Sequence, residues 1–134
     1  MAARPAVNFR MDKKGFVAIF KEVLDRETVT QCVTSWLERF EKIEQVIPGM
    51  EGTFEVKEAG EIMWEPHMQY RISNGDQFAW VYASLDQRAM ETTGFQDAEI
   101  SLCLEVLLEL PGVMDVVDEK NQRRLDELEK AGII

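Results

Sequence analysis

The chain has 134 residues, of which 46 % are hydrophobic, and this length and composition fit one globular domain with a real core but not two. Its net charge of −10 argues against nucleic acid as the main partner, because phosphate binding needs a basic surface. No apolar run approaches the roughly 20 residues that a membrane helix needs, and no signal-peptide pattern opens the chain. Cys32 and Cys103 both fall in apolar contexts, so we expect two buried, unpaired thiols in a cytosolic protein.

The charge is unevenly distributed along the chain. The first 26 residues hold six basic and three acidic side chains, so residues 27–134 carry a net charge of −13. Solvated helix faces are one interpretation of this asymmetry. The other is that the basic end of one copy meets an acidic surface of another copy or of a partner.

Two helices are predicted in the first third of the chain. Asp12 is a suitable cap for a helix over 13–24, whose apolar residues fall on one stripe. Asp25 or Thr28 begins a longer helix, which Pro48 and Gly49 end. Its apolar residues follow the three-then-four spacing of an amphipathic helix: Val29, Cys32, Val33, Trp36, Leu37, Phe40 and Ile43.

The middle of the chain is typical of antiparallel strands. The stretch "GTFEVKEAG" alternates apolar and polar residues, and "EIMWEPHMQYRI" continues extended, with Pro66 at a sheet edge or bend. Asn74 and Gly75 then form the strongest short hairpin signal, because both central residues of a type I′ turn need positive φ. A third strand, "FAWVYASL", follows the turn.

The last third predicts a loop and two helices. The stretch "DQRAMETTGF" is polar and rich in turn formers, and the helix over 96–110 is so apolar that we expect burial on more than one side. Pro111 and Gly112 end that helix. "VMDVV" is an apolar connector or a strand, and Asp118 caps a final charged helix over 119–131.

This order predicts an α+β fold, in which helices pack on one face of an antiparallel sheet of three to four strands and an extra helix stands at the C-terminus. We expect a single domain over 1–134. An N-terminal arm covers 1–11, and a C-terminal helical extension covers 113–134.

The hairpin register separates two faces of the sheet. A turn centred on Asn74 and Gly75 pairs Arg71 with Phe78 and Gln69 with Trp80, and directly opposed residues share a face. The apolar core face then carries Met68, Tyr70, Ile72, Ala79, Val81 and Ala83. The opposite face carries His67, Gln69, Arg71, Phe78, Trp80 and Tyr82.

Three aromatic side chains in a row are a large apolar area to leave in water, although arginine can stack on them. Three kinds of cover are possible. The same chain can supply it, through its N-terminal segment or its final helix. Another subunit can supply it instead, or the face can form a small-molecule site.

Catalytic chemistry has few candidates in this sequence. His67 is the only histidine and has no cysteine or carboxylate nearby at metal-ligand spacing. No phosphate loop, nucleophile elbow or zinc motif is present, and the carboxylates are scattered over helix faces. Met63 and Trp64, beside Pro66, look like contact residues. We therefore expect a protein that is not an enzyme and has no catalytic residue, cofactor or metal.

The layout resembles the head–tail connector proteins of tailed bacteriophages, also called neck or tail-completion proteins. The resemblance begins with "RMDKKGFVAIFKEVLDRETV", which gives a short helix before a longer one. In "IPGMEGTFEV", Pro-Gly then leads into a strand. The stretch "FAWVYASLDQRAMETTGFQDAEISLCLEVLL" completes it with the returning strand of the hairpin, a loop and a buried helix. It covers about 7–110. The stretch "EAGEIMWEPH" and the final helix stand outside the pattern.

The resemblance implies a structural virion protein, assembled in the host cytoplasm, that forms a ring joining portal or adaptor to tail terminator or tail tube. Copies of the chain would contact one another, with no active site, no sequence-specific nucleic acid and no membrane. An acidic ring would also let DNA pass without sticking. The candidate partner interface comprises Met63, Trp64, Arg71, Phe78, Trp80 and Tyr82.

An acidic inhibitor or immunity-type protein, which neutralises a basic enzyme, is the alternative from another class. Its size, its acidity and its lack of chemistry fit equally well. The basic N-terminal region and the apolar hairpin favour self-association, and an enzyme acting on a small molecule comes third.

Overall fold

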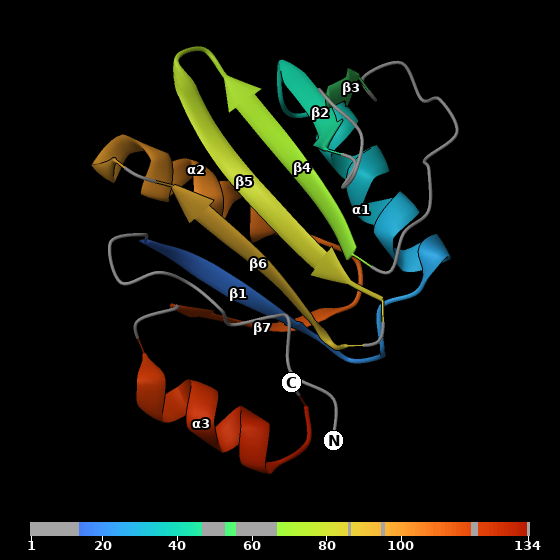
Figure 1. Cartoon of the computed structure of the whole chain (residues 1–134), viewed down its shortest axis with the longest axis vertical. Helices are drawn as coiled ribbons and strands as arrows, with labels where there is room; N and C mark the ends of the chain where they lie inside the picture. Colours follow the sequence, from blue (N-terminus) through green and yellow to red (C-terminus); the bar gives the residue numbers. More distant parts are fainter. Residues whose placement is uncertain are drawn as a thin grey trace.

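The computed structural model describes residues 14–46, 53–55, 67–85, 87–94, 96–118 and 121–133 (Figure 1). In chain order the elements are β1 (Lys14–Phe20), α1 (Arg26–Leu37), β2 (Lys42–Val46), β3 (Thr53–Glu55), β4 (His67–Asn74), β5 (Gln77–Ser84), β6 (Ala89–Gly94), α2 (Asp97–Leu107), β7 (Val113–Asp118) and α3 (Gln122–Lys130). None of the described helices is long and apolar enough to cross a membrane. The expected N-terminal arm, 1–11, lies outside the described residues.

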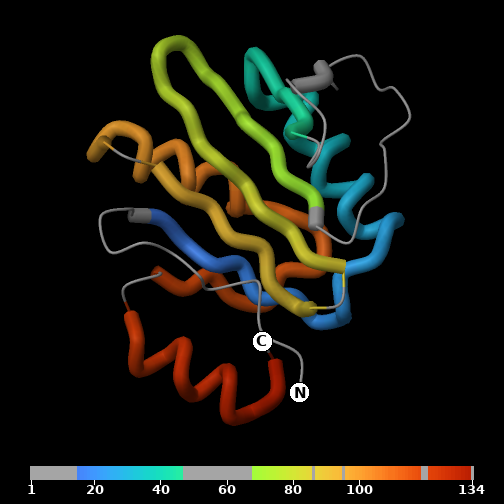
Figure 2. Tube along the Cα trace, in the orientation of Figure 1, coloured from blue at the N-terminus to red at the C-terminus, as the bar shows by residue number. Residues whose placement is uncertain are grey.

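The described strands form one antiparallel sheet in the order β3-β2-β4-β5-β6-β1-β7. Strand β1 lies between β6 and β7, so the first described strand is paired with two strands from the second half of the chain (Figure 2). This long-range pairing joins both ends of the described chain into one sheet. The expected α+β class with an antiparallel sheet is confirmed, whereas three to four strands is too few.

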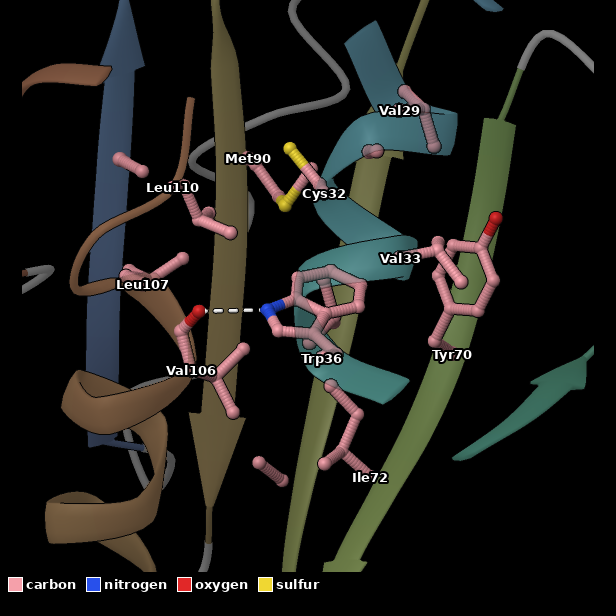
Figure 3. Packing of buried hydrophobic residues seen from close by; sticks show 14 of the residues in the cluster. Val29, Cys32, Val33, Trp36, Tyr70, Ile72, Met90, Val106, Leu107 and Leu110 are labelled. Atoms are coloured by element: carbon pink, nitrogen blue, oxygen red, sulfur yellow. Dashed lines mark hydrogen bonds between the residues drawn. The ribbon is translucent and has the colours of Figure 1, made fainter. Parts of the chain in front are cut away.

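One face of the sheet carries the main core. Helices α1 and α2 pack on it, and its strand residues include the whole set assigned from the hairpin, Met68, Tyr70, Ile72, Ala79, Val81 and Ala83, each at most 1 % exposed. Trp36 of α1 ties the two helices together, because its indole N–H donates to the carbonyl oxygen of Val106 in α2 at 2.8 Å (Figure 3). The Trp36 ring also meets Tyr70 edge-on, with 5.9 Å between ring centroids.

Helix α3, the extra C-terminal helix, packs on the opposite face of the sheet, which the final helix was one candidate to cover. Its Leu125 and Leu128 form a second, smaller cluster with Val17, Ile19, Ala89 and Val117. These four residues come from β1, β6 and β7, so α3 covers only that end of the sheet. Its N-terminal cap is Asn121, whose side chain accepts from the Arg124 N–H, and the expected cap at Asp118 is wrong.

The predicted helix over 13–24 is wrong, because residues 14–20 form strand β1. Its apolar residues serve both faces: Ala18 and Phe20 lie in the main core, and Val17 and Ile19 lie under α3. A strand covered on both sides reads as a continuous apolar run, and such a run also satisfies a helical stripe.

The second helix begins at the expected cap, Asp25, but ends at Leu37 instead of running to Pro48. Residues 42–46 form β2, in which Ile43 and Gln45 are buried and their neighbours are more exposed. Phe40 and Ile43 thus fit the helical spacing by coincidence, since both reach the same core from a turn and a strand.

The predicted loop "DQRAMETTGF" contains strand β6, which is also a correction. All six of its residues are buried, although three of them, Glu91, Thr92 and Thr93, are polar. Because β6 lies between β5 and β1, burial comes from its position and not from hydrophobicity. The helix expected over 96–110 is present as α2, but it ends at Leu107, three residues early. At its start the Gln96 N–H donates to the Glu99 carboxylate.

The hairpin joins the expected strands, but its register is shifted. Arg71 pairs with Trp80 where Phe78 was expected, and the turn residues are Gly75 and Asp76, flanked by Asn74 and Gln77. Gly75 has φ +65° and Asp76 does not share that sign, a pattern typical of a type II′ turn with glycine first. A shift of two residues preserves the side-chain alternation, so the face assignment survives.

Candidate functional site

The candidate site is the aromatic patch, defined as Glu44, Arg71, Phe78, Trp80 and Tyr82. Strands β2, β4 and β5 place these side chains on the face opposite to α1 and α2. All five are partly exposed. The sequence-based face assignment is therefore confirmed for Arg71 and the three aromatic residues.

Arg71 organises the patch. Its guanidinium carbon lies 4.0 Å from the centroid of the Phe78 ring and 5.8 Å from that of Trp80. Its Nη1 lies 3.3 Å from Oε1 of Glu44, which stands on the neighbouring strand directly opposite Arg71. The carboxylate holds the guanidinium in place over the rings, and the cation in turn offsets the charge of a side chain that is only 12 % exposed.

Glu44 is the residue of this patch that the sequence did not point to. The stretch that contains it was assigned to the second helix, and a helical Glu44 would not face Arg71. The sequence of Lys42–Val46 held no clear signal, because the burial alternates along this strand but the hydrophobicity does not: Gln45 is buried and Val46 is not.

The far side of the patch is bounded by Glu91 of β6, which pairs directly with Tyr82. Burial raises the pKa of the Tyr82 phenol, and the nearby Glu91 carboxylate raises it further. Tyr82 thus remains a neutral hydrogen-bonding group at ordinary pH. A patch of neutral aromatic rings around one balanced Arg–Glu pair suits binding to another surface more than proton transfer.

Helix α3 does not extend over the aromatic patch. Figure 1 looks onto this face and shows α3 beyond β1 and β7, while no other described helix crosses β4 and β5 on the same side. Among the described elements, α3 therefore covers this face only at the end formed by β1, β6 and β7. Met63 and Trp64, the other two candidate interface residues, lie outside the described residues, as does the side chain of His67.

Nucleophilic and metal chemistry find little support among the described side chains. No group of three or more His, Cys, Asp or Glu in this part of the chain could hold a metal ion. Cys32 and Cys103 form no disulfide with each other and are fully buried in the main core. Burial raises the pKa of the Cys32 thiol to about 12, which leaves it protonated and unreactive near neutral pH.

Comparison of the chain with models of known protein families, with curated proteins and with solved structures finds no match.

Proposed function

We propose that the protein is a non-catalytic structural component that assembles through its aromatic patch into an oligomeric ring, as a connector at the head–tail junction of a tailed phage. The observation that carries this proposal is the patch itself, a cluster of Phe, Trp, Tyr and Arg on the half of a sheet face that no described helix covers. Trp, Tyr and Arg are the residues that dominate protein–protein binding energies.

The stacking of Arg71 prepares the patch for association. A side chain already fixed over Phe78 by Glu44 loses little conformational freedom when a partner arrives, so less binding energy goes into ordering it. The partner surface would exclude water from the rings and strengthen both the cation–π contact and the ion pair. The patch is in this sense pre-organised for binding.

Copies of the same chain are the preferred partners because the chain carries opposite charge in two regions. The net charge is +3 in the first 26 residues and −13 in the rest. A head-to-tail contact between unlike surfaces can repeat from copy to copy, and it gives a ring where the rotation between copies closes. Such a ring in the virion would dock portal or adaptor on one side and tail terminator or tail tube on the other.

The resemblance to connector proteins supports the proposal less than the patch does. It rested partly on a short helix before the longer one, and β1 stands in that place. It also expected the longer helix to lead straight into the first strand, and an exposed loop after the hairpin, but β2 stands between α1 and β3 and β6 lies in the loop. Only the hairpin and the buried helix α2 keep the expected order.

Replacing Trp80 with serine tests the role of the patch. We expect Trp80→Ser to give a folded monomer that no longer assembles, because it removes the largest ring of the patch. Sedimentation velocity measures assembly, and circular dichroism measures folding. Leu108→Ser is the matched control, since Leu108 is 47 % exposed at the end of α2, away from the patch, and should leave assembly unchanged.

Two outcomes would contradict this proposal. If Trp80→Ser unfolds the chain, the patch is internal core, since losing a fully buried tryptophan costs about 3–5 kcal/mol. If Trp80→Ser and the Leu108→Ser control assemble equally well, the patch is not the interface.

An acidic inhibitor of a basic protein is the second candidate, and the net charge of −10 favours it. Such a protein would remain a monomer and bind its target through surface carboxylates, with strong dependence on salt. The aromatic patch has no evident role in that function, which is why we place it second.

A further inference from the structure

Strand β7 ends the described sheet and pairs with β1 alone among the described strands. Its sequence, "VMDVVD", is rich in β-branched residues and contains neither lysine nor proline, the residues that usually keep edge strands from pairing. Met114 on this strand is 48 % exposed. By composition β7 is thus a strand that would accept a further partner.

The backbone of β7 shows which groups point away from β1. The Val116 N–H donates to Oδ1 of Asp115, its own neighbour, at 2.9 Å. Two residues further on, the Asp118 carbonyl accepts from the Asn121 N–H at 2.9 Å. Alternate residues of an antiparallel edge strand turn their N–H and C=O outward, so Val116 and Asp118 belong to the outward set. Both of these outward contacts are local, within β7 or its turn toward α3.

Asp115 is held in this position from α3. Its second oxygen, Oδ2, lies 3.0 Å from Nη2 of Arg124. Arg124 is fixed in turn by the Asn121 cap on its N–H and by Glu127, 3.6 Å from its Nη1. The hydrogen bond to the Asp115 side chain, and its charge, also raise the pKa of Arg124.

We propose that the outer edge of β7 is a second interaction surface for strand pairing with β7 of another copy, held closed by Asp115. The carboxylate occupies the N–H that an incoming strand needs and presents negative charge to that strand's carbonyl groups. In an antiparallel pair centred on Val116, the Val116 residues of the two copies face each other and each Asp115 faces a Val117. This strand register is self-complementary, which a two-fold dimer requires. The surface is separate from the aromatic patch and does not depend on the proposed function.

Asp115→Ala in the full chain tests this inference, in both the wild-type and the Trp80→Ser background. We expect Asp115→Ala to form strand-paired dimers in both backgrounds, because the freed Val116 N–H gains a partner in the second copy. The dimer dissociation constant should be at least about tenfold lower than without Asp115→Ala. Asp126→Ala is the matched control: it removes the same charge from α3, where Asp126 contacts Gln122 and not β7. It should not change the oligomeric state.

Val116→Pro in the Asp115→Ala chain identifies the surface. Proline removes the outward N–H that strand pairing uses while an edge strand tolerates it, so the dimer should revert to the parent state. Asp115→Asn, which keeps an oxygen acceptor for Val116, should dimerise less than Asp115→Ala. The inference is wrong if Asp115→Ala associates no more than Asp126→Ala, or if Val116→Pro leaves its dimer intact.

Discussion

Tyr70 places a polar hydroxyl group inside the apolar main core. Its side chain is fully buried against Trp36, and its hydroxyl has no hydrogen-bond partner among the residues that the structure describes. An unpaired buried hydroxyl costs about 1–3 kcal/mol of stability. Burial raises the pKa of this phenol well above its ordinary value, and the nearby Cys32 raises it further.

Tyr70→Phe should therefore stabilise the protein by about 1 kcal/mol at pH 7, because the ring stays and the unpaired group goes. The effect should grow at alkaline pH. Above the unfolded pKa of about 10, the Tyr70 phenol ionises in the unfolded chain but stays protonated in the folded one, because burial raises its folded-state pKa. The parent protein therefore loses stability as pH rises from about 10 toward the folded-state pKa, and Tyr70→Phe does not. Urea unfolding at pH 7 and at about pH 10.5 measures both effects.

Tyr82→Phe is the control for this prediction, since Tyr82 lies partly exposed in the aromatic patch. It should change stability at pH 7 by less than about 0.5 kcal/mol. A clear loss of stability in Tyr70→Phe would mean that the hydroxyl has a partner in solution, such as a buried water.

At the scale of elements, α1 and α2 are coupled through one hydrogen bond across 70 residues of sequence, from Trp36 to the Val106 carbonyl. The carbonyl of Val106 lies at the end of α2, where the last turn leaves carbonyls without helical partners. Trp36 thus satisfies a group that α2 cannot satisfy itself. The same side chain fills the space between both helices and Tyr70 (Figure 3).

Trp36→Phe should destabilise the chain by about 1–3 kcal/mol, because the bond to Val106 is lost and the smaller ring leaves space. Thermal unfolding followed by circular dichroism checks it. Trp80→Phe makes the same chemical change in the patch and should cost much less. Equal effects of the two substitutions would contradict the different burial of the two tryptophans.

At the scale of the whole molecule, charge and surface act in opposite directions on association. Copies with net charge −10 repel one another at long range, while the aromatic patch attracts at contact. Salt screens this repulsion, and also the attraction between the basic first 26 residues and the acidic remainder, but it leaves the contact between aromatic rings largely intact. The response to salt therefore separates the two candidate functions.

Raising salt from about 0.01 M to about 1 M shortens the Debye length from about 30 Å to about 3 Å. Self-assembly through the patch should strengthen over this range, as measured by light scattering at fixed protein concentration. Binding of the acidic chain to a basic partner would weaken instead. Assembly that dissolves steadily with added salt would argue that unlike charges, and not the aromatic rings, hold the copies together.

Local signals were enough to predict several elements. The hairpin, α1 from its Asp25 cap, and α2 were predictable because turn residues, caps and periodicity act within a few positions. The shared face of Arg71, Phe78, Trp80 and Tyr82 followed from alternation alone, and a register shift of two residues could not alter it. The position of the aromatic patch on the half that no described helix covers could not be predicted, because the final helix was a candidate to cover all of that face.

Strands β1 and β6 mark the limit of such reasoning. Ala18 and Ile19 follow one another in an apolar run, and Glu91 and Thr92 in a polar one, yet all four are buried in neighbouring strands. Whether such residues form strands depends on which segments flank them in the sheet. That information lies some 70 residues away in the chain.

The sequence by itself determined the α+β class, the hairpin and its two faces, because these depend on local backbone preferences and on a side-chain period of two. The tertiary structure alone decided that β1 lies between β6 and β7, that α3 covers one end of the second face, and that Glu44 meets Arg71. These features depend on contacts between segments distant in the chain. Burial on both faces also erases the alternation by which a strand is recognised in sequence.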